Sequence, residues 1–323
     1  MAITTFTVCW YWSSSINAVA TQRLLRQFVD PEQDSHDEEE SSSTPVSLAL
    51  MLTSSQLVVG SMLSIIILFV MGQLGFTDDK SIVDSYKNWR RSDIIIGLFH
   101  YFGCLCTNIG FAYGSASLVQ VIKLLEPIET MILAVLVHIA SSNGGINSIG
   151  EVVSVQKVLA TLVIIGGTSM LLGQNSMALN SRSIIAALAS GFCMSSRNVL
   201  KKRAGATKRV GDLPRAESSN VSSASAVDVF MKGMINFSFI TIFAAIPAVV
   251  VLFPGMMIGS ISPKIFSSFF QGPRLTFIQA VIFHCFYNIA SITVLSLTSA
   301  LVHSLLNVGK RIVNVMTGKE DCC

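Results

Sequence analysis

The stretch IIIGLFHYFGCLCTNIGFAYGSASLVQVIKLLEPIETMILAVLVHIA, residues 94–140, decides the fold. About 20 apolar residues span the hydrocarbon core of a bilayer as a helix, so this run is too long for one crossing. Near its middle, GFAYGSAS supplies small and flexible residues for a tight reversal. The stretch therefore predicts two consecutive membrane helices joined by a short turn.

The same pattern continues along the 323 residues. The chain is 51% hydrophobic and 13% charged, with a mean hydropathy of +0.62, whereas soluble domains carry roughly 25% charged residues. A membrane β-barrel would show short alternating segments instead. We therefore expect an all-α polytopic membrane protein with nine visible spans, near residues 5–22, 47–71, 93–113, 115–140, 155–173, 182–200, 229–253, 275–296 and 298–316.

Two polar stretches interrupt these spans. Residues 30–45 are acidic and rich in serine, and residues 201–226 are basic and then rich in serine and alanine. Alternate loops lie on opposite sides of the membrane, and most Lys and Arg residues fall in the loops of one side. This asymmetry places residues 201–226 in the cytosol as a linker. The expected organisation is a first repeat with the sixth span over residues 1–200, this linker, and the remainder of a second repeat over residues 227–323.

The last predicted span carries a polar face. His303, Asn307, Lys310 and Asn314 are spaced by four, three and four residues, and Arg311 lies at the edge of that face. A charge at mid-bilayer costs roughly 2.5–3.5 kcal/mol, so the pair of cations predicts a lined cavity. The alternative is that both cations reach up to the lipid headgroups.

The fourth span, residues 115–140, repeats this arrangement. Ser117, Gln120 and Lys123 lie along one face, and Pro127 is expected to break the helix and free carbonyl groups. The alternative for Lys123 is a structural ion pair with Glu126. SLVQ at 117–120 weakly resembles ALVH at 300–303, which is compatible with inverted repeats around a site in mid-membrane.

Two further patterns concern small residues. Of the seven cysteines, Cys104 and Cys106 lack partners at zinc-ligand spacing, so no metal site is expected, and no cofactor either. Gly110 and Gly114 form a small-xxx-small pair, which fits helix packing between chains as well as within one chain. The sequence therefore leaves the oligomeric state open.

Several motifs together carry a family resemblance. GCLCTNIGFAYGSASLVQVIKLLEPI, SSRNVLKKR, FHCFYNIAS and LVHSLLNVGKRIV resemble the plant triose-phosphate translocators and related nucleotide-sugar transporters, within the drug/metabolite transporter superfamily. The resemblance covers nearly the whole chain in order and spacing. It implies two five-helix inverted repeats, so ten spans are expected and the nine visible ones suggest truncation before the tenth.

The resemblance also implies a substrate site. Its phosphate-binding positions would be Thr107, Lys123, Tyr287, Lys310 and Arg311. Further cavity-lining positions would be Cys104, Gln120, His303 and Asn307; at Cys104 the family usually has histidine. Thr107 could instead bond only to its own helix, and Tyr287 could be an interfacial anchor.

The expected function is exchange of an organic phosphate, of the sugar-phosphate or triose-phosphate type, for inorganic phosphate by alternating access in a plastid envelope. The alternative is a nucleotide-sugar/nucleoside-monophosphate antiporter of the Golgi or endoplasmic reticulum. An enzyme acting on lipid phosphates is disfavoured, because Glu126 and Glu129 are the main acidic residues within spans and no His/Asp constellation faces them. A truncated chain that does not transport is another alternative. No nucleic-acid partner is expected.

Overall fold

The computed structural model describes residues 2–29, 44–75, 91–141, 180–211, 226–257 and 274–318, with a few single positions between 159 and 170. All regular structure within these ranges is helical, which confirms the all-α prediction. The helices are α1 (Ala2–Val29), α3 (Thr44–Gln73), α5 (Arg91–Tyr113), α6 (Ala116–Ile122), η2 (Lys123–Leu125), α7 (Glu126–Ser141), α10 (Ser181–Gly211), α11 (Ala226–Met257), α13 (Arg274–Leu297) and α14 (Ala300–Gly318).

Five of these helices are long and apolar enough to cross a membrane by length and composition. They run over Pro45–Gln73, Arg91–Tyr113, Ser181–Ala204, Phe230–Gly255 and Arg274–Leu297. The predicted spans near 115–140 and 298–316 are also helical, but the first is divided into short helices and the second carries the polar face described above. The predicted span at 155–173 falls almost entirely outside the described residues.

Two helices continue beyond the ends that the sequence predicted for them. The linker expected over residues 201–226 is helical through Gly211, where α10 ends, and α11 begins at Ala226. Lys, Arg and Ala are strong helix formers, so the basic part of the linker continues the preceding helix. The first helix extends to Val29, and residues 30–43 lie outside the described ranges.

The predicted break at Pro127 is present and has a local cause. In an α-helix the carbonyl of Lys123 would accept from the N–H of residue 127, but proline has no N–H. The carbonyl accepts instead from the N–H of Glu126, and residues 123–125 form a single 3₁₀ turn. The break therefore positions Lys123 and Glu126 where α6 and α7 meet.

Two helix pairs are joined by similar turns. A two-residue turn joins α5 to α6, and another joins α13 to α14. In each, a serine caps the second helix: the Oγ of Ser115 accepts from the N–H of Leu118 at 3.1 Å, and that of Ser299 accepts from the N–H of Val302 at 3.2 Å. The weak sequence likeness between 117–120 and 300–303 thus falls at the start of two helices that are each capped by a serine.

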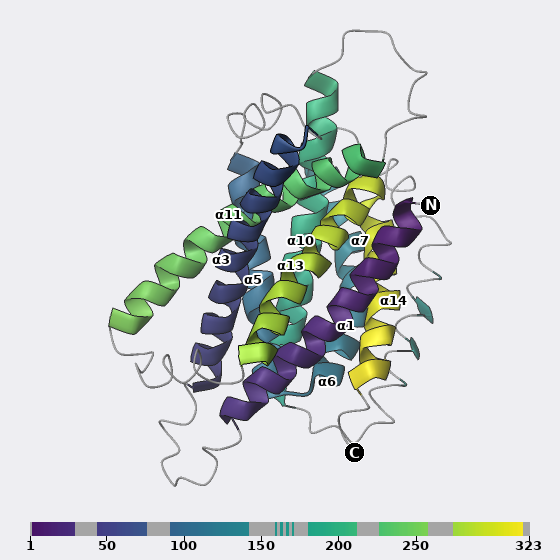
Figure 1. Ribbon diagram of the computed structural model, residues 1–323. Coiled ribbons are helices and arrows are strands. Elements are labelled where there is room, and N and C mark those ends of the chain that lie inside the picture. Colours follow the sequence, from purple (N-terminus) through teal and green to yellow (C-terminus); the bar gives the residue numbers. More distant parts are fainter. Residues whose placement is uncertain are drawn as a thin grey trace, which may run out of the picture.

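The helices pack side by side in a bundle (Figure 1). α1 lies between α13 and α14 in this view, α10 packs along α5, and α11 packs across α3 and α5. Gly110 approaches Val119 of α6, and Gly114 approaches Ser183 of α10, so this small-xxx-small pair serves packing within the chain. An apolar cluster fills the space between helices and includes Leu24, Leu48, Leu52 and Leu118.

The crossing of α5 and α11 depends on a glycine. A Cβ atom added at Gly97 would lie 2.5 Å from the Cβ of Phe243 and 2.9 Å from the carbonyl carbon of the same residue. Overpacking of this kind costs about 1–3 kcal/mol. We predict that Gly97→Ala lowers the unfolding temperature in detergent, measured by tryptophan fluorescence.

Gly166→Ala is the matched control, because an added Cβ at Gly166 would meet no atom of the described residues within 4 Å. It should leave the unfolding temperature equal or higher. Equal unfolding temperatures for Gly97→Ala and the unaltered protein would contradict the close packing of α5 on α11.

Candidate functional site

A polar cavity lies at the centre of the helix bundle. Its lining comes from α1, α5, the α6–η2–α7 segment, α10, α13 and α14. All five positions implied by the resemblance, Thr107, Lys123, Tyr287, Lys310 and Arg311, line this cavity. The other lining residues are Ser14, Asn17, Ala18, Phe111, Gln120, Glu126, Met194, Arg197, Asn288, Ser291 and Asn307.

A buried ion pair joins α7 to α14. The Nη2 of Arg311 donates to the Oε2 of Glu126, and the side chains are 4% and 1% exposed. The Nδ2 of Asn307 donates to the Oε1 of Glu126 at 2.9 Å. Both carboxylate oxygens are therefore engaged by α14, so Glu126 does not pair with Lys123 as one sequence interpretation held.

Arg311 retains unused donors. Its Nε and Nη1 are buried and have no hydrogen-bond partner among the described residues. A buried donor without an acceptor is costly, and most at a charged group. A guanidinium that lines a cavity with two of its three nitrogens unpaired is well suited to receive an oxyanion.

Lys310 lies between two aromatic rings. Its Nζ is 5.1 Å from the centroid of Trp10 and 5.5 Å from that of Tyr287. Such cation–π contacts stabilise an ammonium by about 0.5–2 kcal/mol. Lys310 and Arg311 thus both face the interior, and the alternative in which they reach the headgroups is wrong. Tyr287 is likewise a cavity residue and not an interfacial anchor.

Lys123 belongs to a second hydrogen-bonded group. Its Nζ donates to the Oγ1 of Thr107, and this hydroxyl is 2.7 Å from the Oγ of Ser190. The same threonine oxygen lies 2.7 Å from the carbonyl oxygen of Gly103, one turn earlier on α5. Thr107 therefore bonds to its own helix but not only to it, because it also presents an acceptor to Lys123.

The N-terminal helix closes one side of the cavity. The hydroxyl of Tyr11 donates at 2.6 Å to the carbonyl of Leu306, which lies 295 positions later in the sequence. The Oγ of Ser15 donates to the Oδ1 of Asn314 at 2.7 Å, and the Nδ2 of Asn314 donates to the Oγ of Ser14 at 3.2 Å. Sequence reasoning missed this helix, because its serines and asparagine resemble ordinary membrane-helix residues.

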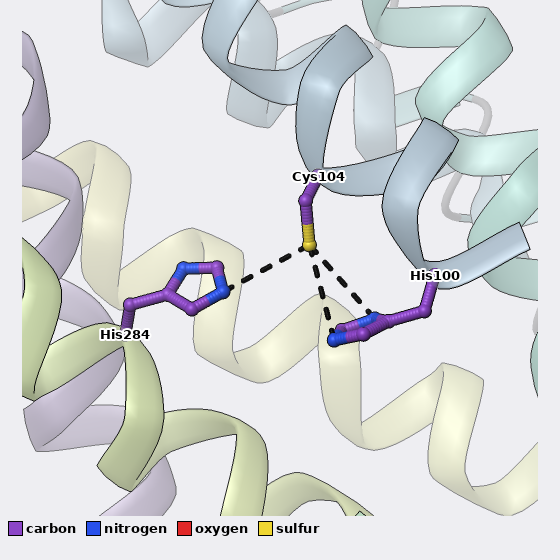
Figure 2. Close-up of side chains that lie close together, drawn as sticks. All are labelled: His100, Cys104 and His284. Atoms are coloured by element: carbon purple, nitrogen blue, oxygen red, sulfur yellow. Dashed lines mark hydrogen bonds between the residues drawn. The ribbon is translucent and has the colours of Figure 1, made fainter. Parts of the chain in front are cut away.

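The predicted additional positions divide into two groups. Gln120 and Asn307 line the cavity, whereas Cys104 and His303 are buried outside its lining. The ring of His303 stacks on that of Trp10 at 4.7 Å, and its Nε2 is 3.3 Å from the Oγ of Ser291. Cys104 lies between two histidines, as Figure 2 shows.

Arg197 is a further cavity residue that the prediction of the site did not include. Its Nη1 is 3.0 Å from the Nδ1 of His100, and its Nε and Nη2 donate to the Oδ1 of Asn198. The Ser196-Arg197-Asn198 motif was the available signal, and it was used only for the family resemblance. With Arg197, four cations and one carboxylate, Glu126, line the cavity. This excess of positive charge suits a multivalent anion.

Comparison with known proteins identifies the family of the chain. A search of curated proteins finds no match. A sequence model described as the Triose-phosphate Transporter family matches residues 1–318. This match covers almost the entire chain, including every helix described above. The chain therefore belongs to the Triose-phosphate Transporter family, and it is a multi-pass membrane transporter of the drug/metabolite type.

Proposed function

We propose that this chain is an antiporter that exchanges an organic phosphate, of the sugar-phosphate type, for inorganic phosphate by alternating access. Thr107, Lys123, Tyr287, Lys310 and Arg311 form its phosphate site. Family membership supports the transport of a small molecule. The choice of a phosphate compound rests on the cavity itself.

The unpaired donors of Arg311 carry this proposal. The Nε and Nη1 of a buried guanidinium point to a missing acceptor, since native structures pair nearly all such groups. A phosphate group offers three acceptor oxygens and about −1.5 to −2 charges. Lys310, whose ammonium lies against two aromatic rings, supplies a second cation that can turn to the same anion.

The charge of the cavity also explains why exchange is favoured over one-way transport. The four cations and Glu126 leave three positive charges in excess. Closing the empty cavity would dehydrate like charges together, which costs several kcal/mol per ion. A bound phosphate group removes most of that excess, so the loaded carrier reorients more readily than the empty one.

A nucleotide substrate is the second candidate. The ring of Phe111 lines the cavity together with that of Tyr287, and an aromatic ring can stack on a nucleobase. The same cations would then bind the phosphates of a nucleotide sugar or a nucleoside monophosphate. The two candidates therefore differ in the group attached to the phosphate and share the site.

Counterflow in proteoliposomes tests the proposal. Vesicles loaded with inorganic phosphate should take up labelled phosphate, and a small sugar phosphate should inhibit this uptake. Lys310→Ala combined with Arg311→Ala should reduce uptake at least about 30-fold, because removing charged partners of a bound anion costs about 2 kcal/mol or more. Arg274→Ala, which removes an exposed cation at the start of α13, should retain uptake.

The outcomes separate the candidates. If phosphate-loaded vesicles are inactive but vesicles loaded with a nucleoside monophosphate take up a nucleotide sugar, the second candidate is correct. If the double variant retains full phosphate uptake, the site assignment is wrong. Absence of exchange under both conditions from folded protein would contradict antiport altogether.

The exchange mechanism gives a separate prediction. Vesicles preloaded with labelled phosphate should lose it quickly into a phosphate solution and at least about tenfold more slowly into a solution of a non-substrate salt, because the empty cavity bears the uncompensated charge. Liposomes without protein give the leak rate. Equal efflux rates under both conditions would show that the empty carrier reorients freely.

Glu126→Gln tests the electrostatic balance of the site. Removing the carboxylate leaves Arg311 buried without a counterion, which should destabilise the substrate-free protein by about 3–5 kcal/mol. Phosphate should then raise the unfolding temperature more than it does in the unaltered protein, because the anion replaces the lost charge.

Glu129→Gln is the matched control. Glu129 is one turn further along α7 and does not line the cavity. Its substitution keeps the carboxylate of Glu126 that pairs with Arg311. Phosphate should raise the unfolding temperature of this variant by about as much as it raises that of the unaltered protein. A smaller shift for Glu126→Gln than for Glu129→Gln would contradict binding of the anion at Arg311.

A further inference from the structure

Three side chains outside the cavity lining meet between α5 and α13. His100 and Cys104 lie one turn apart on α5, and His284 faces them from α13 (Figure 2). The Sγ of Cys104 is 3.8 Å from the Nδ1 of His100 and 3.9 Å from the Nε2 of His284. All three residues are buried, and one ligand atom from each lies within 4.8 Å of the others.

The two histidines occupy matching places in the two similar helix pairs. His100 precedes Ala116, the first residue of α6, by 16 positions; His284 precedes Ala300, the first residue of α14, by the same 16. Equivalent positions of two repeats lie close together when both are near the pseudo-twofold axis that relates the repeats. This arrangement brings together two imidazoles that are far apart in sequence, and Cys104 supplies a sulfur beside them.

The spacing of these atoms is close to that of metal ligands. With metal–sulfur bonds of about 2.3 Å and metal–nitrogen bonds of about 2.0–2.1 Å, sulfur and nitrogen ligands of a trigonal site lie roughly 3.8 Å apart. The observed sulfur–nitrogen separations of 3.8 and 3.9 Å are close to this value. Hydrogen bonds from a thiol are weak, so the cluster in its metal-free form gains little from these contacts.

The charge nearby selects the ion. The guanidinium of Arg197 lies 3.0 Å from the Nδ1 of His100. A thiolate with Zn²⁺ would place a net positive charge beside this cation, whereas a thiolate with Cu⁺ is neutral. Thiolate and imidazole ligands suit Cu⁺, and one sulfur with two imidazoles is a known trigonal copper arrangement.

We propose that His100, Cys104 and His284 form a three-coordinate Cu⁺ site between α5 and α13. Copper takes the place of the thiol proton of Cys104, which is released to solvent, because the thiolate is the ligand. The Nδ1 of His100 turns from Arg197 to the metal. The site lies about one helical turn from the cavity lining, since Thr107 follows Cys104 by three residues and Tyr287 follows His284 by three.

Copper binding to the purified full chain tests this site. Reduced protein in detergent, without oxygen, is titrated with Cu⁺ that is buffered by a chromogenic Cu⁺ chelator, and copper per chain is measured by elemental analysis. The unaltered protein should retain one more equivalent than Cys104→Ser or His284→Asn. X-ray absorption of the retained copper should show one sulfur and two nitrogen ligands.

Cys285→Ser is the matched control. Cys285 is also buried, lies next to His284 in the sequence, and is close to Gly60 of α3. This variant should retain the additional equivalent, whereas Cys104→Ser and His284→Asn, each verified as folded by its unfolding transition, should lose it. Equal copper retention by Cys104→Ser and Cys285→Ser would overturn the proposal, as would Zn²⁺ retention tighter than that of Cu⁺. The test is independent of transport.

Discussion

The buried ion pair between Glu126 and Arg311 is the interaction on which the arrangement of the cavity depends. It connects the start of α7 to α14, and Asn307, one turn before Arg311 on α14, donates to the same carboxylate. Glu126 can face α14 because Pro127 withholds a hydrogen bond from the carbonyl of Lys123. A purely structural pair of this kind is rarely favourable when buried. Under the proposed function, the pair partly neutralises the positive charge of the site that binds the phosphate group.

The remaining cations are held by neutral groups. Lys310 lies against Trp10 and Tyr287, and Lys123 donates to a threonine hydroxyl. Because such contacts are weaker than a buried ion pair, both ammonium groups can turn to a ligand at small cost. α1 matters here, since it carries Trp10 and is joined to α14 by hydrogen bonds at Leu306 and Asn314. The N-terminal helix is therefore part of the site, although it is far from α14 in sequence.

The sequence predicted the faces of individual helices better than the contacts between them. The spacing of Asn307, Lys310 and Asn314 correctly indicated an inward polar face, and Pro127 correctly indicated a break. Periodicity does not reveal partners across the bundle, so the partner considered for Glu126, as an alternative, was Lys123 one turn away and not Arg311, 185 residues later. For the same reason Cys104 was interpreted without His284. The basic residues after Leu200 were expected in a linker, whereas their helix propensity continues α10.

A structure determined with bound phosphate is the most direct test of the proposed site. We predict a tetrahedral anion in the cavity, with an oxygen within hydrogen-bond distance of the Nη1 or Nε of Arg311. We also predict that Lys310 leaves the ring of Trp10 to contact the same anion. An anion bound elsewhere, with Arg311 still paired only to Glu126 and Lys310 unmoved between its rings, would contradict the claim that these buried cations form the substrate site.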